Sequence, residues 1–100
     1  MESSIYEITA EVREDLIPEF EKYMISRHIP DVMATGAFES CMFTRSRRGR
    51  YRIFYRTSRT LLEGYLREHA PRLRAHIVES FPEGVELSRE EWQVIGDHAK

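Results

Sequence analysis

The sequence predicts an α+β fold of the ferredoxin-like type, a β-α-β-β-α-β sandwich in a single domain over residues 1–100, with both helices on one face of the sheet. Three observations lead to this prediction. Apolar and polar residues alternate over residues 4–13, as is typical of a strand. Two further strand patterns meet at Gly49, as in a hairpin. Apolar residues recur at helical spacing over residues 15–28 and 60–81.

The hairpin at Gly49 sets the register of the predicted sheet. Because glycine enters the left-handed region without a Cβ penalty, we expect Arg47-Arg48-Gly49 to form a three-residue loop with Ser46 facing Arg50. The face predicted to be buried then carries Cys41, Phe43, Tyr51, Ile53 and Tyr55. The opposite face carries Ser40, Met42, Thr44, Arg52, Phe54 and Arg56.

The first strand and helix follow from periodicity and from two prolines. Alternation over residues 4–13 places Tyr6 on the core side of the strand. Pro18 is tolerated only in the first turn, which places the helix start near Asp15. The residue before a proline avoids helical geometry, so Pro30 predicts that this helix ends near His28.

The second half of the chain repeats the pattern of a helix followed by a strand. Thr60-x-x-Glu63 has the form of a capping box, and Pro71 is expected to break or kink the helix that follows. Val85 and Leu87 alternate, whereas Trp92 and Val94 alternate on the opposite parity. A β-bulge within residues 88–91 would reconcile the two pairs.

One face of the predicted sheet is left without helices. We expect Glu7 and Glu11 to share this face with Arg52 and Arg56 on neighbouring parallel strands, as cross-strand charge pairs. The face is too apolar to remain bare and too charged to be a dry core, so it predicts a homodimer. Its other expected residues are Ile5, Phe38, Met42, Thr44 and Phe54, with Met42, Thr44 and Phe54 on the dimer face.

Composition narrows the class of protein. A net charge of −2 argues against a general nucleic-acid binder, because such proteins are usually strongly basic. The single Cys41 lies in the predicted core and cannot form an internal disulfide, which favours a reducing cytoplasm. No apolar run approaches the length that spans a membrane, and the first ten residues lack the apolar stretch of a signal peptide. We therefore expect a soluble, cytoplasmic protein.

Two stretches, His28-Ile-Pro-Asp-Val-Met-Ala-Thr-Gly-Ala-Phe38 and Glu68-His-Ala-Pro-Arg-Leu-Arg74, resemble the signatures of a small bacterial family catalogued as a domain of unknown function. That family resembles the dimeric α+β barrel superfamily, in which two ferredoxin-like subunits pack their open sheet faces together. The superfamily includes antibiotic-biosynthesis monooxygenases, haem-degrading monooxygenases, lactone isomerases and ligand-sensing regulatory domains. The resemblance implies the fold and the dimer, and it names no reaction.

The candidate ligand-binding residues are polar groups in these stretches and on the open sheet face. His28 is either a proton donor or ligand anchor at a pocket rim, or a histidine that caps a helix C-terminus. The full candidate set is His28, Asp31, Arg52, Arg56 and His69. His69 and His76 are about 10 Å apart along a helix, so they cannot share a metal, and we expect neither a metal nor a cofactor.

The residues favour some functions of this fold and disfavour others. RNA stacking is disfavoured because Arg50 and Arg52 occupy the two aromatic places of the stacking motif. The haem-degrading members of the superfamily that the chain resembles are expected to use an asparagine with a tryptophan and a histidine, and the chain has no asparagine. We expect a non-enzymatic homodimer that binds a small ligand or serves as an interaction module. The alternative is a cofactor-independent monooxygenase or isomerase for an aromatic metabolite, with a pocket lined by Tyr23, Tyr55, Tyr65 and Trp92.

Overall fold

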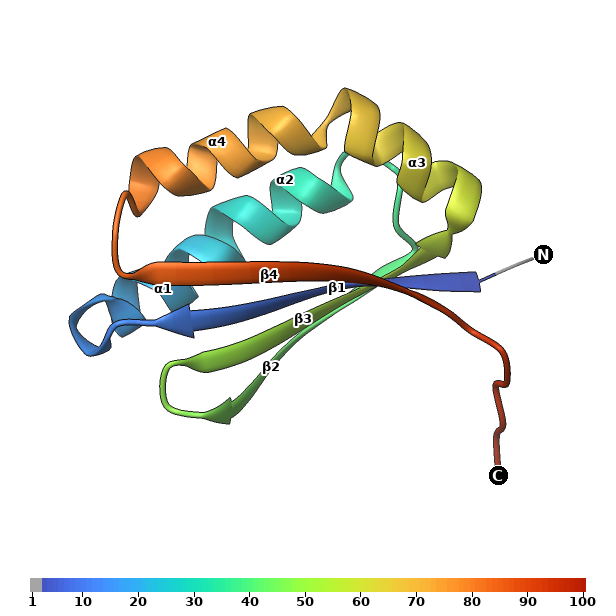
Figure 1. The fold of residues 1–100 in the computed structure, drawn as a ribbon, viewed down its shortest axis with the longest axis horizontal. Coiled ribbons are helices and arrows are strands. Elements are labelled where there is room, and N and C mark those ends of the chain that lie inside the picture. The colour runs from blue at the N-terminus through green and yellow to red at the C-terminus, as the bar shows by residue number, and fades with distance from the viewer. Residues whose placement is uncertain (1–2) are drawn as a thin grey trace.

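The computed structural model describes residues 3–100, which form one four-stranded sheet in the order β2-β3-β1-β4, with every helix on the same side of it (Figure 1). The strands are β1 (Ser3–Val12), β2 (Ser40–Arg47), β3 (Arg50–Ser58) and β4 (Val85–Gln93). The helices are α1 (Ile17–Tyr23), α2 (Ile29–Met33), α3 (Arg59–Glu68) and α4 (Ala70–Ser80), with a 3-10 turn at Glu14–Leu16 and a π-helical turn at Met24–His28. We call the two sides of the sheet the helix face and the open face. The α+β ferredoxin-like prediction is confirmed.

All neighbouring strands are antiparallel, so the expectation of parallel neighbours for β1 and β3 was wrong. The cause lies in the connections. One helical crossover makes β2 parallel to β1, but the tight hairpin then reverses the chain, and it is the reversed strand β3 that lies beside β1. The alternation predicted for β1 holds, and Tyr6 lies in the core at 5 % exposure.

The β2–β3 hairpin has the predicted register, with Cys41 opposite Tyr55 and Phe43 opposite Ile53. The loop is shorter than expected, because Arg47 rather than Ser46 faces Arg50 and a bulge follows Arg45. Gly49 has φ +83°, and its carbonyl accepts a 2.8 Å hydrogen bond from the Val12 N–H at the end of β1. The hairpin is thereby tied to the central strand.

The first helical segment does not end at His28 as predicted. It passes through the π-helical turn directly into α2 (Figure 1). Pro30 has no N–H, and its ring would crowd the carbonyl one turn earlier. The wider turn, in which the Ile29 N–H bonds to the Met24 carbonyl, relieves that crowding immediately before the proline. A consequence is that His28 is turned inward and buried.

The second helical segment breaks at His69, two residues before Pro71, as predicted. Its N-cap is Ser58 rather than Thr60, because α3 starts directly after β3. The Ser58 hydroxyl accepts a 3.3 Å hydrogen bond from the Leu61 N–H.

Strand β4 pairs with β1 without a register shift, so the predicted bulge within residues 88–91 was wrong. Regular pairing places Trp92 opposite Ile5 on the open face and Arg89 opposite Ile8 on the helix face. The apolar alternation stops after Leu87 because β4 is an edge strand. The residues of β4 that follow Leu87 lie at the border of the core, where long polar side chains can keep their charged ends in water.

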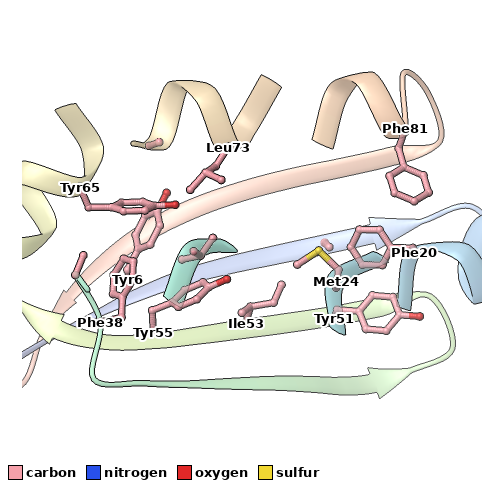
Figure 2. Packing of buried hydrophobic residues seen from close by; sticks show 14 of the residues in the cluster. Tyr6, Phe20, Met24, Phe38, Tyr51, Ile53, Tyr55, Tyr65, Leu73 and Phe81 are labelled. Atoms are coloured by element: carbon pink, nitrogen blue, oxygen red, sulfur yellow. The ribbon is translucent and has the colours of Figure 1, made fainter. Parts of the chain in front are cut away.

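The core lies between the helices and the sheet and is rich in aromatic rings (Figure 2). Phe38 belongs to it at 6 % exposure, packed 4.8 Å from the rings of both Tyr55 and Tyr65, so its predicted place on the open face was wrong. The cause is that β2 starts only at Ser40, so Phe38 precedes the strand and its alternation. Among residues 3–100, no helix is both long and apolar enough to cross a membrane.

Candidate functional site

A small cavity of about 20 Å³ lies within the core between α1, α4 and the sheet. Its apolar wall is formed by Ile8, Phe20, Met24, Ile53, Ile77 and Leu87. Its polar residues are Tyr6, His28, Tyr55, Tyr65, Arg74 and Arg89. The volume suits a group of one or two heavy atoms, since a single water requires about 10–15 Å³.

Two buried polar atoms at this cavity have no hydrogen-bond partner within the described part of the chain: the Tyr55 hydroxyl and the Arg74 Nε. Tyr55 is 1 % exposed, and burial raises its pKa far above that of a free tyrosine. The Cys41 thiol lies beside this hydroxyl and can offer it only a weak sulfur hydrogen bond outside ordinary geometry. A buried unpaired donor costs about 1–3 kcal/mol, so such groups in a native protein require an explanation.

His28 reaches the cavity because the π-helical turn rotates it toward the core. Burial lowers its pKa to about 4, and the nearby carboxylate of Asp31 only partly opposes this effect. The ring stacks on Tyr23 at 6.1 Å. The imidazole is therefore neutral at physiological pH, with one nitrogen able to accept a proton and the other able to donate one.

Two arginines from different elements meet at the cavity. Arg74, on α4, donates a 2.8 Å hydrogen bond from NH2 to the Tyr6 hydroxyl. Arg89, on β4, lies close enough to the same hydroxyl and to Arg74 for both to influence it. The pKa of Arg89 is lowered, first because the fold removes water from its guanidinium and second because Arg74 carries the same charge.

The remaining charge at the cavity is small. Burial raises the pKa of Tyr65 to about 12, so its hydroxyl stays protonated, and His28 is neutral. Within residues 3–100, no carboxylate forms a salt bridge with Arg74 or Arg89. The polar side of the cavity is therefore cationic.

Of the residues predicted from the sequence to bind a ligand, His28 lines the cavity. Asp31 is exposed and lies near His28. His69 sits at the helix break, with its ring 6.2 Å from that of Tyr65, and is not part of the wall. Arg52 and Arg56 lie on the open face, on the other side of the sheet from the cavity.

Of the four aromatic residues predicted to line a pocket, two line the cavity and two do not. Tyr55 and Tyr65 line the cavity, as expected. Tyr23 packs against His28 and does not line the cavity, and Trp92 lies on the open face. The predicted place of these two residues in the pocket lining was wrong. The sequence did contain a signal for the missed arginines. Arg89 continues the parity of Leu87, and Arg74 lies four residues after the buried Ala70.

The open face carries the residues predicted for a dimer. Met42 is 63 % exposed and Trp92 is 48 % exposed, with Phe54 between them on the central strands. The Arg52 guanidinium lies over the Phe54 ring at 5.9 Å and reaches Glu7 at 3.6 Å, as the sequence predicted for that charge pair. Arg56 instead pairs with Glu39 and with Asp97 in the C-terminal segment, which runs toward this side of the sheet (Figure 1).

The arginines of the hairpin do not form a free cationic edge. Arg47 and Arg50 both bond to Glu11, and Arg48 bonds to Glu14. Arg45 reaches Glu21, which also accepts a hydrogen bond from the Tyr51 hydroxyl at 2.5 Å. Their charges are largely compensated within the subunit. Arg74 and Arg89 at the cavity are not compensated in this way.

The topology, the covered helix face and the bare open face define a ferredoxin-like α+β protein. The chain belongs to the family described as Domain of unknown function (DUF4286), whose model matches residues 3–95. A search of curated proteins finds no match.

Two solved structures have the same fold. One is a dimeric ferredoxin-like protein from an uncultured marine organism, 11 % identical, with a TM-score of 0.64 over 98 % of this chain and 100 % of that chain. The other is Rv0793 from Mycobacterium tuberculosis, 18 % identical, with a TM-score of 0.60 over 97 % of this chain and 99 % of that chain. At these identities the likeness establishes the fold alone.

Proposed function

We propose that the protein is a homodimer that binds a small organic ligand in the cavity between the helices and the sheet. The observation that carries the proposal is the pair of buried polar atoms, the Tyr55 hydroxyl and the Arg74 Nε, that border the cavity without partners. A ligand that supplies hydrogen-bond partners there would offset the cost of burying them. A scaffold without a ligand would gain stability from apolar residues at both positions.

The walls of the cavity allow it to enlarge. Met24 has three rotatable side-chain bonds and can repack around a guest. Arg89 belongs to β4, an edge strand whose single sheet neighbour is β1. Motion of these two side chains requires no change in the central sheet. The observed cavity is then the closed form of a larger binding site.

Binding of phenol, followed by NMR chemical shifts, tests this proposal. Phenol has an apolar ring for the wall and a hydroxyl that can pair with Tyr55. We expect saturable shifts at His28, Ile53 and Tyr55, and we expect Ile77→Trp, which fills the cavity, to abolish them. Shifts confined to Met42 and Phe54 would contradict a site in the cavity.

The homodimer rests on the charge pattern of the open face. Glu90 stands directly opposite Glu7, and Glu86 directly opposite Glu11, in the β1–β4 pairing. Like charges in such positions repel. Glu86 and Glu90 form no salt bridge within the described residues, whereas Arg47 on β2 and Arg50 and Arg52 on β3 lie across the sheet, paired with Glu11 or Glu7. A two-fold axis parallel to the strands would place β4 of one subunit over β2 and β3 of its partner and neutralise these carboxylates.

Replacement of Phe54 should dissociate this dimer. We expect the wild type to sediment at micromolar concentration with twice its chain mass of 11.9 kDa, because the open face can bury the roughly 1,000 Å² that a specific interface needs. Phe54→Lys should give the monomer mass with an unchanged far-ultraviolet spectrum. Val78→Lys, at an equally apolar site on α4 with 62 % exposure, is the matched control and should remain dimeric. If both variants stayed dimeric, the interface would lie elsewhere.

The second candidate function is a cofactor-independent monooxygenase or isomerase for an aromatic metabolite. It is favoured by one observation: His28 places an imidazole at the cavity, where it could accept a hydrogen bond from a phenolic substrate. Consumption of phenol during the titration, lost in His28→Gln while binding persists, would favour the enzyme over the binding protein.

A further inference from the structure

We infer that the ligand of this cavity is an organic carboxylate, whose charged group binds between Arg74 and Arg89 while its apolar part points toward Ile53 and Leu87. The inference rests on the proposed ligand site and names the chemical class that fits it. It concerns the helix face of the sheet, and it does not involve Arg52 or Arg56.

The geometry supplies donors from two independent elements. The Arg74 Nε is buried with no partner, and its NH2 already holds the Tyr6 hydroxyl at 2.8 Å. Arg89 lines the same cavity from the edge strand β4. A guanidinium presents several N–H groups in one plane, a shape that matches the two oxygens of a carboxylate. Both guanidiniums therefore line one cavity, and among residues 3–100 no carboxylate pairs with either of them.

The two positive charges at the cavity also favour an anion. Two guanidiniums that influence each other without an intervening carboxylate destabilise the folded state, and an anion between them would convert that repulsion into attraction. The hairpin shows how this chain compensates arginines when no ligand is involved, because each one there has a glutamate. Among residues 3–100, four arginines have no salt bridge, and of these only Arg74 and Arg89 line the cavity.

The rest of the lining selects an organic anion over an inorganic one. Beside the two arginines and the polar groups of Tyr6, His28, Tyr55 and Tyr65, the wall consists of isoleucine, leucine, methionine and phenylalanine side chains. Inorganic phosphate is polar on every side and would leave oxygens facing these groups without hydrogen bonds. A short carboxylate has a polar end for the arginines and an apolar end for the wall. Propionate is a small probe of that kind, and its binding requires the cavity to enlarge through the motion of Met24 and Arg89.

The test is a titration of the ¹⁵N-labelled protein at constant ionic strength with propionate, its neutral isostere propionamide, and inorganic phosphate. We expect the Arg74 and Arg89 side-chain N–H resonances to shift saturably with propionate, and propionamide and phosphate to bind at least about tenfold more weakly. Arg89→Gln, at an exposed position, should retain the fold and weaken propionate binding by about tenfold or more. Arg67→Gln, on the exposed side of α3, is the control and should leave binding unchanged.

The outcomes separate this inference from the proposed function. Equal binding of propionate and propionamide in the cavity would leave a ligand site in place and overturn its preference for a carboxylate. Phosphate binding as tightly as propionate would show a general anion site and overturn the organic ligand. The inference also fails if propionate causes no saturable shift, or if Arg67→Gln weakens its binding as much as Arg89→Gln does.

Discussion

Gly49→Ala should destabilise the protein by about 3 kcal/mol or more, well beyond the usual effect of a loop substitution. A Cβ at Gly49 would lie 2.8 Å from the Val12 carbonyl oxygen, which is backbone and cannot turn aside. The residue also has φ +83°, where a side chain adds strain. Moving the loop to relieve the contact would stretch the hydrogen bond from the Val12 N–H to the Gly49 carbonyl. Urea denaturation measures the loss.

Gly36 provides a matched control. It has φ +77°, but a Cβ there would meet nothing within 4 Å. Gly36→Ala should therefore show the conformational penalty alone, about 1 kcal/mol. The difference between the two variants isolates the contact between the hairpin and β1. Equal losses for both would mean that the hairpin is not held against the central strand as described.

Acidification should destabilise the protein between pH 6.5 and 4, by up to about 3 kcal/mol from His28. The pKa of His28 is about 4 in the folded state, against about 6.5 for an unperturbed histidine. In this range the unfolded chain binds a proton that the folded chain does not, so stability falls as the pH falls. Above pH 6.5 both states hold a neutral imidazole, and this contribution no longer changes.

His28→Leu should flatten this part of the pH profile, because leucine fills a similar space and does not titrate. His98→Gln, at an exposed position in the C-terminal segment, is the control and should keep the wild-type profile. Thermal denaturation at a series of pH values makes the comparison. A wild-type profile with no slope between pH 6.5 and 4 would show that His28 is solvated and does not reach the cavity.

The sequence predicted the fold because its strong local signals agree with the tertiary structure. Gly49 determines the pairing of Phe43 with Ile53, and alternation places Tyr6 in the core. Pro71 marks the helix break at His69. Each signal is local: a glycine where φ is positive, a proline that interrupts a helix, and a period of two that separates the faces of a strand. Such a pattern can be interpreted without knowledge of the rest of the molecule.

The candidate site was less predictable because it depends on exceptions to those patterns. Placing Trp92 on the same face as Leu87 requires a bulge that β4 does not contain. Without the bulge, Arg89 falls on the helix face beside Leu87. The burial of His28 depends on a π-helical turn, which no local signal distinguished from a helix end before Pro30.

The two proposed interactions use opposite sides of one sheet. The ligand contacts the helix face through Arg74 and Arg89, and the partner subunit covers the open face around Phe54. Tyr55 and Phe54 are neighbours on β3 and point to these two sides. Loss of the dimer therefore does not by itself remove the cavity, and the two proposals can fail separately.

A high-resolution crystal structure of the protein as purified tests the central claim most directly, because it shows the contents of the cavity. The account predicts electron density larger than a water molecule beside the Tyr55 hydroxyl and the Arg74 Nε, bonded to both, in a dimer whose open sheet faces meet. A single water that bridges those two atoms would satisfy them both without a ligand. Such a water in the cavity, together with an open face that contacts only solvent, would contradict the account.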